Sequence, residues 1–144
     1  MPSDQTAGPP PAPRGTLATR TLAMPADANP SGDIFGGWVL SQMDIAGGIT
    51  AATRAAGRVA TVAVDAMVFH KPVYVGDVLC TYADIIRVGR TSIAIHIEAW
   101  ALRSRQGERV KVTEGTFTLV AIDDAGRPRP VPPEKTTARE EPAA

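Results

Sequence analysis

One helical pattern among several strand patterns is the feature that most restricts the fold of this chain. Residues 34–56 place apolar side chains three and four positions apart, which is typical of a helix. Glycine suits the residue that ends a helix, so we expect the helix to stop at Gly57. Asp33 immediately precedes the pattern, where its carboxylate would accept hydrogen bonds from the first free N–H groups as an N-cap.

Strand patterns account for most of the remaining sequence. A short stretch, 16–23, precedes the helix, and period-two stretches follow it at 58–69, 77–89, 91–104 and 109–123. The β-branched run in 58–69 is long enough for a buried strand. Strands joined by short turns form an antiparallel sheet, and one helix covers only one face of it. The sequence therefore predicts an α+β fold with one long apolar helix packed on the sheet.

The two ends of the chain differ in composition from its centre. Residues 1–14 and 131–144 are rich in Pro, Ala and charged residues and show no period. We expect a disordered N-terminal tail and a mobile C-terminal tail. Residues 15–130 then form a single domain with a modest core, which association with further copies would help to bury.

Charge and cysteine content restrict the partners and the location. The 15 Lys and Arg residues balance the 15 Asp and Glu residues, which gives no case for nucleic-acid binding. The chain has no run of about 18 apolar residues and no secretory signal, so we expect no membrane partner. With Cys80 as its single cysteine the chain forms no intrachain disulfide, and a cytoplasmic location is expected.

Asp44 lies near the middle of the helical pattern. The residues that share its helix face are mostly small: Gly37, Leu40, Ser41, Gly47, Gly48 and Ala51. Each interior glycine costs roughly 1 kcal/mol of helix stability relative to alanine. Such a face indicates close approach by another backbone or a ligand. Asp44 is then either a carboxylate on a tightly approached surface or a solvent-facing helix residue.

Gly36 and Gly37 fall in the first turn of the expected helix. Backbone N–H groups in a first turn have no intrahelical acceptor, and the helix dipole adds partial positive charge there. Without side chains to obstruct them, these donors suit an oxygen that develops negative charge. The alternative is that the two glycines only allow close packing of the helix.

Four stretches of the sequence carry a family resemblance. RTLAMPADANPSGDIFGGWVLSQMDIAGGI resembles the acyl-CoA thioesterases of the hotdog fold, in particular the bacterial YciA-like branch. The likeness continues through GRVATVAVDAMVFHKPVYVGDVL, GRTSIAIHIEAW and VTEGTFTLVAID, and covers about residues 15–130. It implies an antiparallel sheet wrapped around a central helix, dimers that commonly assemble into hexamers, and an active site for acyl-CoA at the dimer interface.

The resemblance also assigns roles to particular residues. The family's catalytic aspartate falls on Asp44, and the backbone that holds the oxyanion falls on Gly37, beside Gly36. A functional Asn of the related two-domain thioesterases falls on Asp33, so its role does not transfer directly. The positions near the turns that bind coenzyme A in such enzymes are Lys71, Arg87, Arg90, Thr91 and Ser92.

Thioester hydrolysis needs few groups. Asp44 would either deprotonate a water or attack the carbonyl to form an anhydride, and the sequence does not separate the two routes. The coenzyme A thiolate leaves readily, so no strong general acid is needed, and coenzyme A is part of the substrate. We expect no other cofactor and no metal, because His70 and His96 have no Glu or Cys at ligand spacing.

Two alternative functions remain within this fold. A hotdog dehydratase needs a catalytic His, and NPSGDIFGG contains none. A non-catalytic acyl-CoA-binding or assembly protein would have lost the acidic residue at position 44, which this chain has kept. Cys80 is expected to be a small buried side chain, Trp38 and Trp100 to pack, and His96 to line a contact between subunits.

Overall fold

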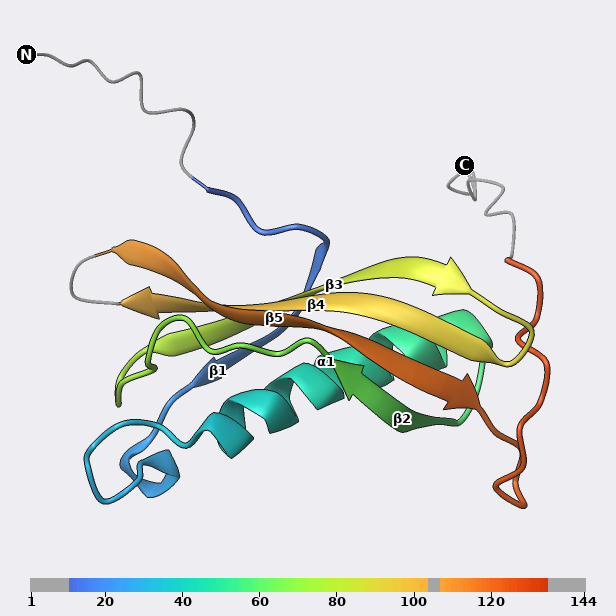
Figure 1. The fold of residues 1–144 in the computed structure, drawn as a ribbon, viewed down its shortest axis with the longest axis horizontal. Helices are drawn as coiled ribbons and strands as arrows, with labels where there is room; N and C mark the ends of the chain where they lie inside the picture. The colour runs from blue at the N-terminus through green and yellow to red at the C-terminus, as the bar shows by residue number, and fades with distance from the viewer. Residues whose placement is uncertain (1–10, 104–106, 135–144) are drawn as a thin grey trace, which may run out of the picture.

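One long helix lies against one face of a five-stranded antiparallel sheet (Figure 1). The computed structural model describes residues 11–103 and 107–134. The elements in chain order are β1 (Thr16–Leu22), a 3₁₀ turn (Pro25–Asp27), α1 (Gly36–Ala55), β2 (Val59–Asp65), β3 (Val78–Val88), β4 (Ser92–Arg103) and β5 (Glu108–Ala121). The strands lie in the order β1-β3-β4-β5-β2. The predicted α+β layout and element order are confirmed.

β2 occupies an edge of the sheet, and the prediction of a buried strand there is wrong. Its residues are half-buried or exposed, with Val62 59% exposed, because β5 pairs with only one of its two sides. The chain does not turn directly from β2 into a neighbouring strand. Residues 66–77 lead instead to β3, which pairs with β1 and β4. β1 and β2 are therefore the two free edges.

The core forms between α1 and the inner face of the sheet. Ile93, Ile95 and Ile97 of β4 are fully buried on this face, as the alternation predicts, and belong to one apolar cluster with Met43 of the helix. Gly47 permits the close approach of the two layers. A Cβ at this position would lie 3.0 Å from the Cδ1 atom of Ile97. Gly47 therefore serves packing inside the chain.

Both predicted helix caps are wrong. The N-cap is Phe35, and Asp33 lies two residues earlier in an extended bridge to Tyr74, so its carboxylate does not cap the helix. At the other end Ala56 adopts the left-handed conformation that glycine usually takes. Gly57 has a different role, because a Cβ there would lie 2.6 Å from the guanidinium of Arg129.

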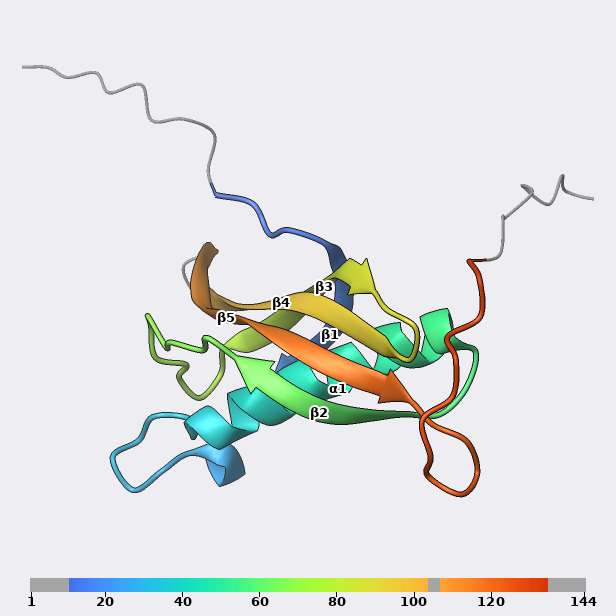
Figure 2. The same cartoon turned by 45° about the vertical axis from the view of Figure 1, so that its right-hand side comes forward.

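Residues 11–15 reach β1 from the side of the sheet opposite the helix (Figure 2). The backbone N–H of Arg14 donates to Glu98 of β4, and its side chain pairs with Asp84 of β3. Near the other end, the N–H of Val131 donates to the carbonyl of Arg90. Residues 1–10 and 135–144 of the predicted tails lie outside the described residues, and the tail boundaries stay predictions.

Among residues 11–103 and 107–134, no helix combines the length and the apolar character that a membrane span requires.

Candidate active site

A groove of about 310 Å³ separates α1 from the edge strand β2. It is lined by Gly37, Leu40, Ser41 and Asp44 of the helix, Thr61 and Val64 of β2, and Phe117 of β5. Phe117 is fully buried, whereas Leu40 and Val64 are 37% and 42% exposed. The groove therefore has an apolar base and an open rim at the free edge of the sheet. It brings Asp44 and Gly37 together, as the resemblance implies.

Asp44 is exposed on the flank of the helix that faces β2. Its Oδ1 accepts a hydrogen bond from the Thr61 hydroxyl at 2.5 Å. The bond joins the helix to the edge strand and orients one carboxylate oxygen, and among the residues that the structure describes no hydrogen bond engages the other. In the single chain the Asp44 carboxylate is exposed and also lines the groove, so both interpretations, a closely approached carboxylate and a solvent-facing one, stay predictions.

Thr61 is the site residue that sequence reasoning missed. It is the one polar side chain in the run VATVAV of β2, which was the available signal. Its partnership with Asp44 depends on where β2 lies relative to the helix. That placement follows from pairing with β5, where Thr61 is opposite Leu119.

The first turn of α1 provides free backbone donors beside Asp44. The carbonyl of Phe35 accepts from Trp38 and Val39, while the N–H groups of Gly36 and Gly37 donate to no acceptor within residues 11–103 and 107–134. A Cβ at Gly37 would meet nothing within 4 Å, so close packing inside the chain does not require this glycine. The open space at Gly37 is where an external group could approach the helix N-terminus.

Asp33 and Gly36 line a second groove rather than the Asp44 groove. This groove, of about 340 Å³, also contains Asn29, Phe69, His70 and Lys71. The side-chain oxygen of Asn29 accepts the backbone N–H groups of Ser31 and Asp33 and so shapes the loop. Asn29 was not predicted as a site residue either, although it lies in the turn-rich segment before the helix.

The five residues predicted to bind coenzyme A do not come together in one chain. Lys71 lies in the second groove, at the N-terminal end of α1. Arg87, Arg90, Thr91 and Ser92 lie at the β3–β4 turn, near the opposite end of the helix (Figure 1). The carbonyls of Arg90 and Thr91 accept bonds from Val131 and Ala121, so this turn also has a structural role.

Comparison with known proteins identifies the family. The sequence model of the thioesterase superfamily matches residues 31–108. The acyl-CoA thioester hydrolase YciA of Salmonella typhimurium is 54% identical over 123 residues, which cover 83% of this chain and 92% of that protein. The chain belongs to the thioesterase superfamily. Its closeness to YciA confirms the predicted branch.

Solved structures confirm the fold of this thioesterase. HI0827, described as a hexameric broad specificity acyl-coenzyme A thioesterase, was solved as its Asp44Ala mutant enzyme. That structure superposes with a TM-score of 0.83 at 50% identity and covers 86% of this chain and 91% of its own. A hexameric hotdog fold thioesterase of Campylobacter jejuni gives a TM-score of 0.77 at 40% identity, covering 82% and 91%. The predicted hotdog fold is confirmed.

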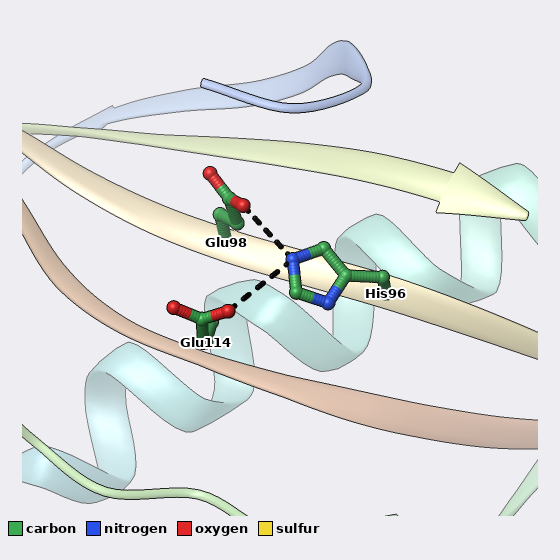
Figure 3. A group of neighbouring side chains, drawn as sticks. All are labelled: His96, Glu98 and Glu114. Atoms are coloured by element: carbon green, nitrogen blue, oxygen red, sulfur yellow. Dashed lines mark hydrogen bonds and ion pairs between the residues drawn. The ribbon is translucent and has the colours of Figure 1, made fainter. Parts of the chain in front are cut away.

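A charged network lies on the face of the sheet away from α1 (Figure 3). His96 Nε2 lies 2.9 Å from Glu98 and 3.6 Å from Glu114 of the neighbouring strand. The statement that no Glu stands at ligand spacing to His96 is wrong, because alternation in β4 places Glu98 on the same face. Lys111 pairs with both carboxylates, so the positive charge of its ammonium group already offsets part of their negative charge. The predicted subunit contact at His96 stays a prediction.

Glu98 is the buried centre of this network, with its side chain 5% exposed. Burial alone would raise the pKa of Glu98. Hydrogen bonds from His96, Trp100 and the Arg14 backbone, together with the charge of Lys111, outweigh that effect and hold the pKa of Glu98 below its ordinary value. Trp100, 3% exposed, packs here as predicted and donates its indole N–H to Glu98 at 2.9 Å.

The lowered pKa of Glu98 predicts a specific acid sensitivity. A carboxyl whose pKa is depressed by folding stabilises the protein above its unfolded pKa, and the contribution is lost as the pH falls through the folded value. Glu98→Gln should lower the free energy of unfolding at pH 7 by about 1–3 kcal/mol, since the donors lose a charged acceptor. The difference from wild type should shrink as the pH falls below 4.5, the ordinary pKa of a glutamate side chain. Urea unfolding between pH 7 and 3 measures the free energy of unfolding of both proteins. A difference that stayed constant over this pH range would contradict the prediction.

Proposed function

We propose that this thioesterase hydrolyses acyl-CoA to a free acid and coenzyme A in the groove between α1 and β2. The observation that carries the proposal is the placement of Asp44, oriented by Thr61, in the same groove as the free N–H of Gly37. A base and an oxyanion donor are the two groups that thioester hydrolysis requires of the protein. The acyl-CoA thioester hydrolase activity that YciA's name states supports the same reaction.

In the general-base route, Asp44 takes a proton from a water whose oxygen bonds to the thioester carbonyl carbon. The carbonyl oxygen becomes negatively charged and accepts the Gly37 N–H. Collapse of this intermediate breaks the C–S bond, and the coenzyme A thiolate leaves and takes up a proton. Asp44 and Gly37 are seven residues apart on the helix, or about 10 Å along its axis. The carbonyl group and the attacking water would lie between these two groups.

The nucleophilic route uses the same groups. Asp44 would attack the carbonyl carbon itself, expel the thiolate and form a mixed anhydride, which water then hydrolyses. The hydrogen bond from Thr61 leaves one oxygen of Asp44 free for either route. Neither route needs a metal or a further cofactor, because the leaving thiolate is stable near neutral pH.

We place a second copy of the chain along the free edge of β2. Pairing there would continue the sheet and cover Val62 and Val64, which are 59% and 42% exposed. It would also supply a further wall to the Asp44 groove, which opens at this edge. Relatives described as hexameric support assembly of three such dimers. Coenzyme A would then contact Lys71 of one copy and the Arg87–Ser92 turn of another.

Release of the coenzyme A thiol from a panel of short, medium and long acyl-CoAs tests the proposal. Wild type should hydrolyse part of the panel. Thr61→Val should lower kcat about tenfold or more, because it removes a hydrogen bond to a charged group, and Thr61→Ser, which keeps the hydroxyl, should restore most of it. A wild-type protein that binds coenzyme A but releases no thiol would favour the non-catalytic binding or assembly function instead.

A further inference from the structure

A buried ion pair lies at the end of the sheet where α1 begins (Figure 1). Asp77, directly before β3, is 5% exposed, and its carboxylate pairs with the guanidinium of Arg103, the last residue of β4. Removing two charges from water costs free energy that their attraction often only just returns. The pair therefore contributes more to the geometry of this region than to net stability.

Arg103 holds the loop that leads from β2 into β3. Its second terminal nitrogen donates to the carbonyl of Pro72 at 3.1 Å, and its Cζ lies 4.5 Å from the centre of the Tyr74 ring. Asp77 in turn accepts the backbone N–H of Tyr74 at 2.9 Å. Arg103 is thus connected to the beginning, middle and end of residues 72–77. Because a guanidinium makes several directed contacts at once, one side chain of β4 fixes the shape of this loop.

The middle of the loop holds the segment that leads into α1. The backbone N–H of Ile34 donates to the carbonyl of Val73 at 2.9 Å, and Asp33 forms an antiparallel bridge with Tyr74. Ile34 is 6% exposed, so it is packed as well as bonded. The loop that Arg103 shapes is therefore one of the supports on which the helix begins.

The start of α1 depends on such backbone supports. Its N-cap, Phe35, has an apolar side chain that cannot cap the first turn. The N–H of Phe35 donates to the carbonyl of Asp27 at 3.0 Å, which is the second support beside the bond from Ile34. Gly37 follows Ile34 by three residues. The position of the Gly37 N–H is therefore set by the segment immediately before it.

We propose that Arg103, acting through Asp77 and the loop 72–77, is a positioning residue for the Gly37 N–H. The inference rests on the proposed function, in which this N–H holds the oxyanion. Within the described residues, Arg103 lines neither the Asp44 groove nor the second groove, so it acts only through the loop. A displacement of about 1 Å in a reacting group can cost about a hundredfold in rate, so loosening the loop should lower kcat.

Hydrogen exchange and turnover of two variants test this. Arg103→Lys keeps a positive charge beside Asp77 but loses the planar guanidinium that also reaches Pro72 and Tyr74. Asp77→Asn keeps an acceptor for the Tyr74 N–H and loses the charge. In each variant the amide protons of residues 34–35 should exchange at least about threefold faster than in wild type, measured by mass spectrometry. At saturating acyl-CoA, kcat should fall about tenfold.

Arg129→Lys is the matched control. Arg129 is also a half-buried arginine that donates to backbone carbonyls, those of Ala55 at 2.9 Å and Ile122 at 3.1 Å. It lies at the C-terminal end of α1, far along the helix from Gly37. Its substitution should lower the melting temperature but leave kcat and the exchange of residues 34–35 near wild type.

Combination with Gly37→Pro shows whether Arg103 acts through that N–H. Proline has no N–H to position, so Arg103→Lys should cost about tenfold in kcat on its own and less than about twofold beside Gly37→Pro. A purely structural role would lower kcat equally in both backgrounds.

The assignment is overturned if Arg103→Lys leaves the exchange of residues 34–35 or kcat unchanged, or if its full loss persists beside Gly37→Pro. Loss of kcat with no change in exchange also contradicts it. A wild type that releases no thiol contradicts the proposed function instead. The exchange measurement then still decides whether Arg103 holds the start of α1.

Discussion

Asp44→Asn is expected to lower kcat for acyl-CoA hydrolysis at least about a hundredfold, the usual contribution of a positioned base. Asparagine has nearly the size of aspartate, and its carbonyl oxygen can still accept the Thr61 hydroxyl, which lies 2.5 Å from Asp44 in the wild type. The substitution therefore removes the proton acceptor or nucleophile while retaining the local geometry. Thiol release measures kcat, and calorimetry with coenzyme A should show binding close to wild type.

Two further variants define what this result means. Asp65→Asn removes an exposed carboxylate at the end of β2, outside both grooves, and should leave kcat near wild type. Asp33→Asn tests the second groove, which Asp33 lines together with His70 and Lys71. If Asp44→Asn retained kcat within a few fold of wild type, Asp44 would be structural, and the catalytic assignment would be wrong.

The sequence predicted the element order because helix and strand periods are local properties. The period of 3.6 in α1 and the alternation of Ile93, Ile95 and Ile97 follow from which side chains must face the core. The position of β2 could not be predicted in the same way. Its neighbour is β5, which follows it by more than 40 residues, and a single period does not specify such pairing. The caps were wrong for a related reason, since Asp33 bridges to Tyr74 and Gly57 lies against Arg129, and both partners are distant in the sequence.

The candidate site could also be predicted only in part: residues of one element could be placed relative to each other, and residues of different elements could not. Asp44 and Gly37 share one helix, so their spacing alone places them on one face, and the structure brings them into one groove. Thr61 comes from β2, so its hydrogen bond with Asp44 could be identified only from the fold. Lys71 and Arg90 were grouped by resemblance, yet one chain holds them at opposite ends of α1 (Figure 1). The second copy of the proposed dimer would relate these two positions to one substrate.

Gly37→Pro is the second substitution with a large expected effect, because it deletes the proposed oxyanion donor. Proline has no N–H and is tolerated in the first turn of a helix, where that group has no intrahelical acceptor. The preceding Gly36 lacks a Cβ, which removes part of the usual clash with proline. Loss of one such donor typically costs about 3 kcal/mol, or roughly a hundredfold or more in kcat. Thiol release at saturating acyl-CoA measures it.

Gly37→Ala separates the lost donor from the added bulk. Alanine keeps the N–H, and its Cβ would enter space that the chain leaves empty within 4 Å. Any decrease that both variants share reports steric conflict with substrate, which raises KM, whereas the decrease specific to proline reports the donor. We expect kcat of the proline variant to lie at least about tenfold below that of the alanine variant. Equal kcat values would mean that the oxyanion is held elsewhere, and the N–H of Gly36 in the second groove would then be the donor to test.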